Sequence, residues 1–279
     1  MKFANYTLFW KDTCRHGLAY AIEHTAALGF DAVEFLVCYD RAPLFESVEQ
    51  ARAAKRLLDQ NKLAVSCYSM LTDLTHPDPS VVLDPVLFNI ECAAALGAPY
   101  FHHTLIPSYS TKTPRRSYTE ALEAIIGRAE QIAAHCAKYA ITCLYEPQGL
   151  YMNGVEGLAP FLARMKKSHP NVGICGDTGN SLFVDVPAEE IFRAFASDIR
   201  HVHVKDYIVT DPDGSEWKQR SVSGKHIRDV LPGQGPTDHA RLFSYLGDYR
   251  GDFSMEFSGS DEEMRASLAY VKELVRPRG

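Results

Sequence analysis

Eight short runs rich in β-branched and aromatic residues alternate with segments of helical periodicity along this chain of 279 residues. Each run has the length of one strand of a sheet. The runs cover residues 2–9, 32–37, 64–70, 99–105, 141–147, 172–177, 200–206 and 252–257. The clearest helical segment covers 117–139, and its first residues, Ser117 to Glu120, have the spacing of a capping box. This alternation restricts the chain to folds built from repeated strand–helix units.

Strands that alternate with helices pair in parallel through right-handed crossovers, so the pattern predicts an α/β fold. A closed barrel and an open, doubly wound sheet both fit. The length suits one barrel, and no GxGxxG motif opens a helix after the first run. No Gly-, Ser- or Pro-rich linker divides the chain. We therefore predict a single (β/α)8 TIM barrel over residues 1–279, with a long irregular βα loop at 207–235 that covers the site.

The charge and hydropathy of the chain argue against two classes of partner. The formal net charge is −6, and no basic run is longer than two residues. Nucleic-acid binding needs a clustered excess of Lys and Arg, so we expect no nucleic-acid partner. No window approaches the ~18 uninterrupted apolar residues of a membrane span, so we expect no membrane partner.

The cysteines and the first residues indicate the compartment. The seven cysteines are odd in number and scattered, and none forms a CxxC pair. This pattern is typical of buried, reduced thiols rather than of a disulfide framework or a structural zinc site. The start, MKFANYTLFWKDTC, lacks the apolar core of a signal peptide. We expect a cytoplasmic protein.

Four consecutive predicted strands end on residues that can bind a metal. They are Glu146, Asp177, His203 and Glu256. The carboxyl ends of barrel strands meet at one face, where active sites lie. A strand-end glutamate alone is more often a solvated cap or an ion-pair partner, but an acid late in a core strand is costly without a partner. Together the four form an oxygen and nitrogen donor set that suits Mn²⁺, Co²⁺, Mg²⁺ or Zn²⁺.

The seventh run, RHVHVKD from Arg200, carries three ionisable side chains at alternate positions. Side chains alternate between the two faces of a strand. His201, His203 and Lys205 therefore point to one face, and the two valines between them point to the other. We expect the polar face to turn toward the barrel interior.

Six segments spread over the chain carry a family resemblance. They are ALGFDAVEF from Ala27, YEPQG from Tyr145, GDTGN from Gly176, HVHVKD from His201, LPGQGPTD from Leu231 and FSMEFSG from Phe253. In combination they resemble the xylose-isomerase-like TIM-barrel superfamily, in its branch of sugar phosphate isomerases and epimerases. The resemblance covers essentially the whole chain. It implies that Glu146, Asp177, His203 and Glu256 bind one divalent cation, with Mn²⁺ as the first expectation, and that Glu146 and Glu256 are also the catalytic acid and base.

The resemblance implies a metal-dependent isomerase that acts on a small sugar. A divalent cation that chelates a carbonyl and the adjacent hydroxyl acidifies the C–H bond between them and stabilises an enediolate. Two glutamates on opposite sides of that carbon can then transfer the proton between its faces. We expect 3-epimerisation of a keto-sugar. The alternative is an inosose-dehydratase-like lyase of a keto-inositol or keto-sugar, because expulsion of a β-hydroxyl needs the same ligands.

Two further functions fit the sequence less well. DNA-repair endonucleases of the superfamily need extra ligands for three zinc ions and a basic face, which the net charge of −6 opposes. A non-catalytic sugar-binding protein would have a degraded ligand set, and this set is intact. Dimers and tetramers are common in such families, which leaves both a homodimer and a homotetramer open.

Five more residues are expected to contact the substrate: Lys205, His103, Asn180, Glu34 and Trp10. Lys205 follows the ligand histidine on the same face, where it can donate to a substrate oxygen or pair with an acid. Asn180 stands three residues after the ligand aspartate, where relatives commonly have a substrate-binding histidine. Glu34 lies near the end of the second run and either orients substrate or supports a ligand. Trp10, at the end of the first run, either stacks on a sugar or packs.

Several neighbouring positions leave alternatives open. His102 and His103 both end the fourth run, and one of them must face the barrel. His201 is expected to support the site rather than to bind the metal. Gly233–Gly235, with the sequence GQG, fits a tight turn better than a phosphate cradle. Val209 stands where some ketose epimerases carry an arginine, which argues against binding a free ketose in their manner.

Overall fold

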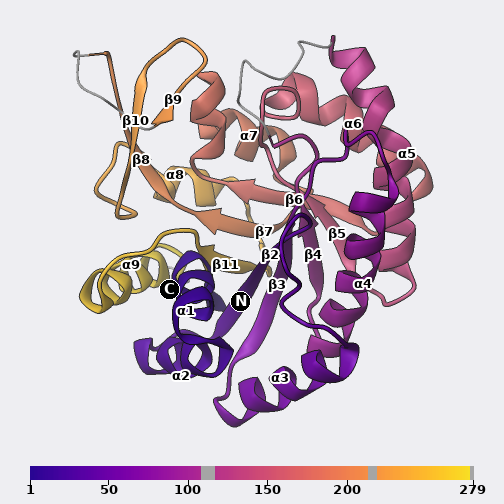
Figure 1. The fold of residues 1–279 in the computed structure, drawn as a ribbon. Coiled ribbons are helices and arrows are strands. Elements are labelled where there is room, and N and C mark those ends of the chain that lie inside the picture. Colours follow the sequence, from indigo (N-terminus) through magenta and orange to yellow (C-terminus); the bar gives the residue numbers. More distant parts are fainter. Residues whose placement is uncertain (108–116, 213–218, 277–279) are drawn as a thin grey trace.

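The computed structural model describes residues 1–107, 117–212 and 219–276, in which eight parallel strands form a closed barrel (Figure 1). Strand β1 pairs with β2 on one side and with β11 on the other, and this pairing closes the ring. The barrel strands are β1 (Phe3–Asn5), β2 (Ala32–Cys38), β3 (Ala64–Leu71), β4 (Tyr100–His103), β5 (Thr142–Tyr145), β6 (Val172–Asp177), β7 (Ile199–Val204) and β11 (Asp252–Met255). The predicted α/β class and (β/α)8 TIM barrel are confirmed.

Helices surround these strands (Figure 1). They are α1 (Thr7–His16), α2 (Leu18–Leu28), α3 (Val48–Gln60), α4 (Ser80–Leu96), α5 (Tyr118–Ala137), α6 (Val155–Ser168), α7 (Ala188–Phe195), α8 (His239–Ser244) and α9 (Asp261–Leu274), with a 3-10 turn η1 (Asn180–Val184). The predicted capping box is present at the start of α5, where the side chains of Ser117 and Glu120 accept each other's backbone N–H. Within the described ranges, no helix is long and apolar enough to cross a membrane.

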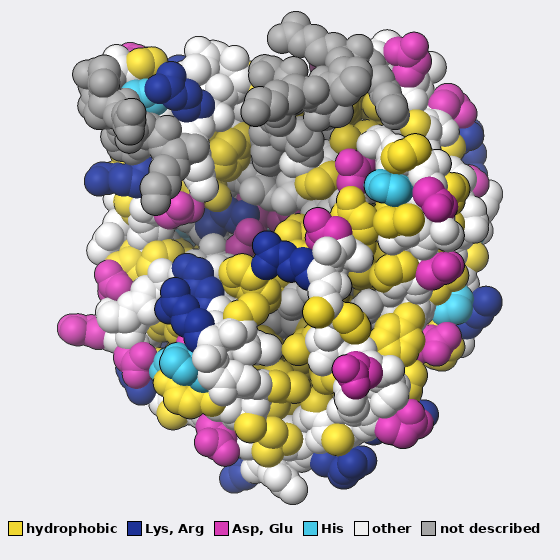
Figure 2. Space-filling model, viewed as in Figure 1, with side chains coloured by type: hydrophobic (Ala, Val, Ile, Leu, Met, Phe, Trp, Pro, Cys, Tyr) yellow, Lys and Arg dark blue, Asp and Glu magenta, His cyan; other side chains and the backbone are white. Residues whose placement is uncertain are grey.

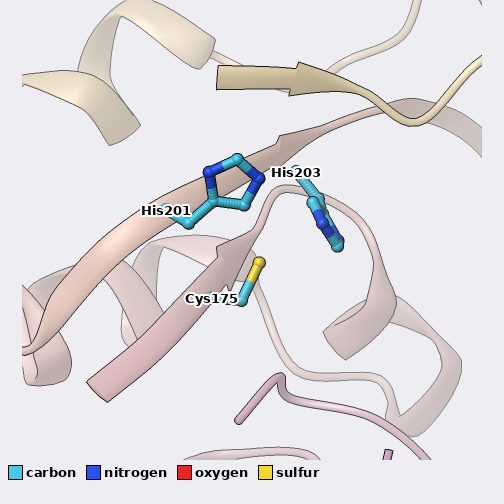
Figure 3. Close-up of side chains that lie close together, drawn as sticks. All are labelled: Cys175, His201 and His203. Carbon is cyan, nitrogen blue, oxygen red and sulfur yellow. The ribbon is translucent and has the colours of Figure 1, made fainter. Parts of the chain in front are cut away.

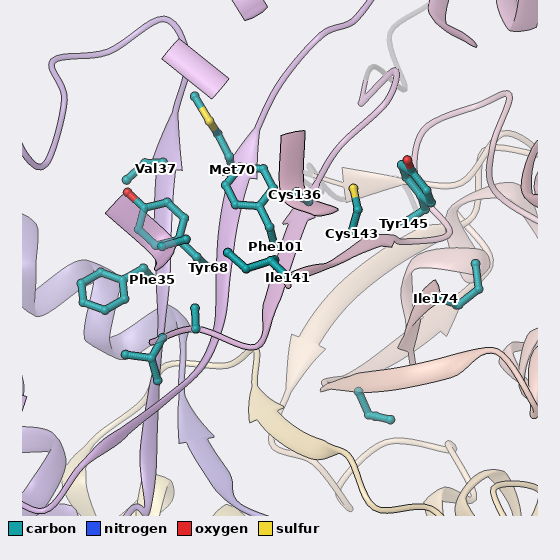
Figure 4. Packing of buried hydrophobic residues seen from close by; sticks show 14 of the residues in the cluster. Phe35, Val37, Tyr68, Met70, Phe101, Cys136, Ile141, Cys143, Tyr145 and Ile174 are labelled. Atoms are coloured by element: carbon teal, nitrogen blue, oxygen red, sulfur yellow. The ribbon is translucent and has the colours of Figure 1, made fainter. Parts of the chain in front are cut away.

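The apolar core lies mainly between the barrel and its helices. Phe35, Tyr68 and Phe101 are register neighbours on β2, β3 and β4, and their rings stack with centroids 5.6 and 5.9 Å apart (Figure 4). The Tyr68 hydroxyl donates to Asn89 Oδ1 of α4 at 2.5 Å, so this row faces the helices. Burial of each such ring contributes about 2–3 kcal/mol. A second, small apolar cluster of the described residues consists of Cys67, Leu144 and Cys175.

The first predicted strand is too long, and this error displaces Trp10. The strand ends at Asn5, and Thr7 begins helix α1. The Asn5 side chain accepts a hydrogen bond from the Phe9 backbone N–H at 3.2 Å, which satisfies an amide in the first turn of the helix. Trp10 therefore lies half-buried within α1 rather than at a strand end.

The region 207–235 is not the irregular loop that we expected. Its described residues form a three-stranded antiparallel sheet of β8 (Asp206–Thr210), β10 (His226–Val230) and β9 (Gln219–Arg220). The register pairs His226 with Thr210, and Figure 1 places the sheet outside the barrel. Strand β8 contains the apolar run Tyr207–Val209, a signal that the turn residues after it obscured. We refer to β8, β9 and β10 as the accessory sheet.

The Gly-Gln-Gly segment binds a carboxylate of the protein itself. Asp206 Oδ2 accepts hydrogen bonds from the backbone N–H groups of Gly233 at 3.1 Å and Gly235 at 2.9 Å. Gly233 has a φ of +91°, and a Cβ on Gly235 would lie 2.3 Å from Asp206 Oδ1. Both positions therefore favour glycine. The expected tight turn is present, and Asp206 fills the place that a phosphate would take.

Replacing Asp206 should destabilise the fold through this turn. We expect Asp206→Ala to lower the free energy of unfolding by about 2 kcal/mol, because two backbone amides lose a charged acceptor. Asp206→Asn keeps one oxygen acceptor and should lose less. Urea denaturation measures both. Asp229→Ala, at an exposed position of β10, is the matched control and should change stability by no more than about 0.5 kcal/mol. Equal stability of Asp206→Ala and the control would contradict the assignment.

Candidate active site

The four predicted metal-binding residues converge at one end of the barrel. Glu146 follows β5 directly, Asp177 ends β6, His203 lies in β7, and Glu256 follows β11. One donor atom of each lies within 4.8 Å of a donor atom of every other member. His203 Nδ1 lies 2.8 Å from Glu146 Oε1 and 3.1 Å from Glu256 Oε2. We call these four residues the quartet.

Asp177 is held by the turn that follows β6. Its Oδ1 accepts hydrogen bonds from the backbone N–H groups of Gly179, at 2.8 Å, and of Asn180. A Cβ on Gly179 would lie 2.4 Å from the Tyr207 ring, so the turn needs glycine there. The GDTGN sequence therefore fixes one carboxylate oxygen and leaves Oδ2 for another partner.

A second polar layer lies beneath the quartet and is centred on Glu34. Its carboxylate accepts hydrogen bonds from His201 Nε2 at 2.7 Å, from His203 Nε2 at 2.9 Å and from Ser69 Oγ. Glu34 is completely buried in β2. Burial alone would raise the pKa of Glu34, but the charges and hydrogen bonds of His203 and His201 outweigh it and hold that pKa well below its ordinary value. Glu34 thus supports the ligand histidine from behind.

This support sets which nitrogen of His203 faces the site. Because Nε2 is directed at the Glu34 carboxylate, Nδ1 is directed at Glu146 and Glu256. A carboxylate behind a histidine fixes its tautomer and ring orientation in metal sites. The Tyr6 ring adds a stacking contact on His203, with centroids 4.9 Å apart. Tyr6 was not predicted, because the first strand was expected to run to residue 9 and Tyr6 then lay in its middle.

Without a cation, the pKa values of the two glutamates of the quartet are shifted in opposite directions. Burial raises the pKa of Glu146 to about 8, helped by Asp177 and Glu256 and opposed by His203. Burial also acts on Glu256, but Lys205 and His203 outweigh it and lower its pKa to about 2. A pair of carboxyl groups with separated pKa values provides one acid and one base.

Lys205 and Asn180 form the polar rim of the quartet. The Lys205 ammonium lies 3.0 Å from Asp177 Oδ2 and 2.8 Å from Glu256 Oε2, and it donates to Asn180 Oδ1 at 2.9 Å. Burial would lower the pKa of Lys205, but Asp177 and Glu256 outweigh it and raise that pKa well above its ordinary value. Asn180 Nδ2 is buried and donates no hydrogen bond to the described part of the chain.

The quartet fits a divalent cation. Asp177 Oδ2 and Glu256 Oε2 are buried and accept no hydrogen bond from any described residue, although Lys205 lies at ion-pair distance. Three carboxylates and one imidazole form a donor set for a hard or borderline metal ion. Once Glu146 has lost its proton, the three carboxylates carry more charge than the Lys205 ammonium, so a divalent ion would complete the balance.

Other groups of possible ligands fit a metal less well. Cys175 lies beside His201 and His203 in Figure 3, and a second group joins Cys67 to Glu34 and His201. Burial raises the pKa of both thiols well above the ordinary value. Metals bind the thiolate rather than the thiol. These groups are therefore better described as part of the hydrogen-bonded layer beneath the quartet.

His102, not His103, is the histidine of β4 that reaches the site. His102 Nδ1 lies 2.9 Å from Ser69 Oγ, and its Nε2 lies 3.6 Å from Glu146 Oε2. His103 instead packs edge-on against the Tyr145 ring, and its Nδ1 lies 3.1 Å from the Thr104 carbonyl. The expectation for His103 misassigned the face of a short strand. Burial, with the charge of His203, lowers the pKa of His102 and favours a neutral imidazole.

The molecule is hollowed where these residues lie. Figure 2 shows a recess over the part of the barrel where β6 and β7 are labelled in Figure 1, with acidic and basic side chains at its floor. Trp10 lies in helix α1, outside the barrel strands that carry the quartet. Among the described residues, the site gathers the quartet and its polar neighbours Glu34, Ser69, His102, Asn180, His201 and Lys205.

Comparisons with known proteins agree with this architecture. Among solved structures, D-psicose 3-epimerase with D-tagatose from Clostridium cellulolyticum H10 superposes with a TM-score of 0.76 at 16% identity, over 99% of each chain. A xylose isomerase-like TIM barrel protein from Mycobacterium smegmatis in complex with magnesium gives 0.75 at 17% identity, over 98% of this chain and 96% of the other. D-allulose 3-epimerase from Methylomonas sp. in complex with D-allulose gives 0.73 at 18% identity, over 98% and 96%.

At these identities the structural likeness establishes the fold. The comparison with curated proteins finds no match. The family model described as xylose isomerase-like TIM barrel matches residues 22–274, which is most of the chain. The chain therefore belongs to the xylose isomerase-like TIM barrel family.

Proposed function

We propose that the protein is a divalent-metal-dependent sugar isomerase that catalyses the 3-epimerisation of a keto-sugar. The observation that carries this proposal is the convergence of Glu146, Asp177, His203 and Glu256 within 4.8 Å of one another. The similarity of the fold to D-psicose and D-allulose 3-epimerases supports the reaction type. Mn²⁺ is the first ion to test, followed by Co²⁺, Mg²⁺ and Zn²⁺.

The two glutamates of the quartet are the proposed acid and base. When bound, a divalent cation would polarise the sugar carbonyl and the adjacent hydroxyl and so acidify the C–H bond between them. Glu146 and Glu256 contact the same imidazole nitrogen from strands β5 and β11, which are separated in the barrel by β6 and β7. One carboxylate removes the proton from one face of the carbon, and the other carboxyl group returns a proton to the opposite face.

Lys205 and Asn180 are the proposed substrate contacts. The Lys205 ammonium is a buried cation that can donate to an oxygen on which negative charge develops. Asn180 Nδ2 is a buried donor whose N–H bonds are not used within the described structure. A sugar hydroxyl would satisfy it, because buried amide groups are nearly always hydrogen-bonded. His102 adds a neutral imidazole 3.6 Å from Glu146 Oε2, whereas His203 lies 2.8 Å from Glu146 Oε1.

A lyase is the second candidate, and two observations favour it. Val209 lies in the accessory sheet, paired with Ile227, and offers no charged group for a ketose. The Lys205 ammonium lies 2.8 Å from Glu256, where it could protonate a leaving β-hydroxyl after Glu256 removes a proton. The substrate of this dehydratase would be a keto-inositol or keto-sugar.

Exchange of substrate hydrogen with deuterium oxide tests the proposed chemistry. A panel of keto-sugars with added Mn²⁺ should take up deuterium at one carbon, as mass spectrometry and NMR will show. We expect Glu146→Gln and Glu256→Gln each to slow this exchange by at least about 100-fold, because each removes one proton-transfer group. Glu23→Gln, at an exposed position of α2, is the control and should exchange at the wild-type rate.

The outcomes of this experiment separate the two candidates. Deuterium at a single carbon with an inverted product supports the epimerase. Loss of water with a new enone absorbance would favour the lyase. Exchange at the wild-type rate in both glutamine variants would refute the acid and base assignment.

The affinity for a cation should depend on pH through Glu146. Below its pKa of about 8 this group carries a proton in the cation-free protein. A ligand carboxylate must lose that proton, so cation binding releases it, and the apparent affinity rises with pH until about pH 8. One displaced proton corresponds to an affinity lower by about tenfold for each pH unit below 8. Calorimetric titration with Mn²⁺ in buffers of different ionisation enthalpy counts the released protons. An affinity that stays constant from about pH 6 to about pH 8 would contradict this prediction.

A further inference from the structure

Lys205 occupies the same carboxylate oxygens that a metal ion would need. Lys205 is 4% exposed, and its ammonium lies 3.0 Å from Asp177 Oδ2 and 2.8 Å from Glu256 Oε2. The other oxygen of Asp177 is already taken by two backbone N–H groups. Asp177 therefore has one oxygen to offer, and Lys205 lies against it.

The backbone of Lys205 is fixed, so this position of its side chain is built in. Its N–H donates to Thr178 Oγ1 at 2.9 Å, and its carbonyl accepts from the Thr178 hydroxyl at 2.7 Å. His239 Nε2 lies 3.1 Å from the same carbonyl. The alternation of β7 then directs Lys205 to the same face as His203.

Lys205 also dominates the charge balance of the quartet. Across residues 1–107, 117–212 and 219–276, no other Lys or Arg lies within 4.0 Å of the carboxylates of Glu146, Asp177 or Glu256. Without a cation, this ammonium thus stabilises the buried carboxylate of Asp177 and, together with His203, the partly exposed carboxylate of Glu256. A divalent ion brought to the same oxygens meets a like charge at short range, and like charges in a site of low dielectric repel strongly.

We propose that Lys205 is an internal competitor of the divalent cation. Its ammonium holds Asp177 and Glu256 in place before the cation binds, and it weakens the affinity for the cation by sharing those ligands. This inference rests on the metal site of the proposed function. It assigns Lys205 a role toward the metal that precedes any contact with substrate, so the protein exchanges its cation more readily than the quartet alone would allow.

The test is cation binding by Lys205→Met, which keeps most of the side-chain volume and removes the charge. A unit charge beside a titrating group changes proton affinity by about ten- to thousandfold, so we expect Lys205→Met to bind Mn²⁺ at least about tenfold more tightly than wild type. Calorimetric titration of chelator-treated protein measures this affinity without substrate. Lys225→Met, at an exposed position, makes the same change in net charge and should bind Mn²⁺ as wild type does.

Thermal unfolding gives a second readout that a purely structural role would not produce. Without a cation, Lys205→Met leaves the buried Asp177 Oδ2 without its charged partner and Glu256 with His203 alone, so the variant should melt below wild type. Saturating Mn²⁺ should remove most of this difference, so the cation-induced rise in melting temperature should be larger in the variant. An equal loss of stability with and without Mn²⁺ would overturn the proposal, as would Mn²⁺ affinity that is unchanged or weaker.

A measurement on the wild-type protein tests the same proposal even if Lys205→Met does not fold. The Lys205 ammonium should give a protected signal in ¹⁵N-detected NMR, assigned with Lys205→Arg, and stoichiometric Mg²⁺ should shift it. A signal that Mg²⁺ leaves unchanged would contradict competition. If neither wild type nor variant bound any divalent cation, the inference and the metal site would both be wrong. If Lys205→Met bound Mn²⁺ more tightly but the wild-type protein turned over no sugar, the inference would be upheld and the proposed reaction would be refuted.

Discussion

The hydrogen bonds from His201 and His203 to the Glu34 carboxylate cross the interior of the barrel, from β7 to β2. A buried carboxylate costs several kcal/mol unless charged or hydrogen-bonding groups surround it, and here two imidazoles and the Ser69 hydroxyl do so. Polar side chains therefore fill the centre of the barrel. Apolar burial is therefore concentrated outside the strands, where the row from Phe35 to Phe101 packs against the helices. The orientation of His203, and with it the geometry of the quartet, depends on this buried carboxylate.

Much of the fold and the quartet could be predicted because they depend on local periodicity and on one property of barrels. Alternation within RHVHVKD was enough to place His201, His203 and Lys205 on one face, and the structure has all three in the interior. The carboxyl ends of parallel strands in a barrel meet at one face, so Glu146 and Glu256 could be placed together although far apart in sequence.

The errors arise where a contact between distant residues or a short element decides the outcome. Asn5 accepts a hydrogen bond from a helical amide and so ends the first strand early, which moves Trp10 into α1. Strand β4 has four residues, too few for its periodicity to show whether His102 or His103 faces inward. The turn at Gly233 is stabilised by a carboxylate 27 residues earlier, which no local pattern reveals.

That turn also separates two structural parts of the polypeptide, the barrel and the accessory sheet. Asp206 is the first residue of β8 and directly follows Lys205, so its bonds to the turn fix the chain at the point where the barrel ends and the accessory sheet begins. Strands beyond this anchor can lengthen, shorten or change their surface while the direction of Lys205 stays the same. The length and surface of the accessory sheet can therefore change without altering the geometry of the quartet.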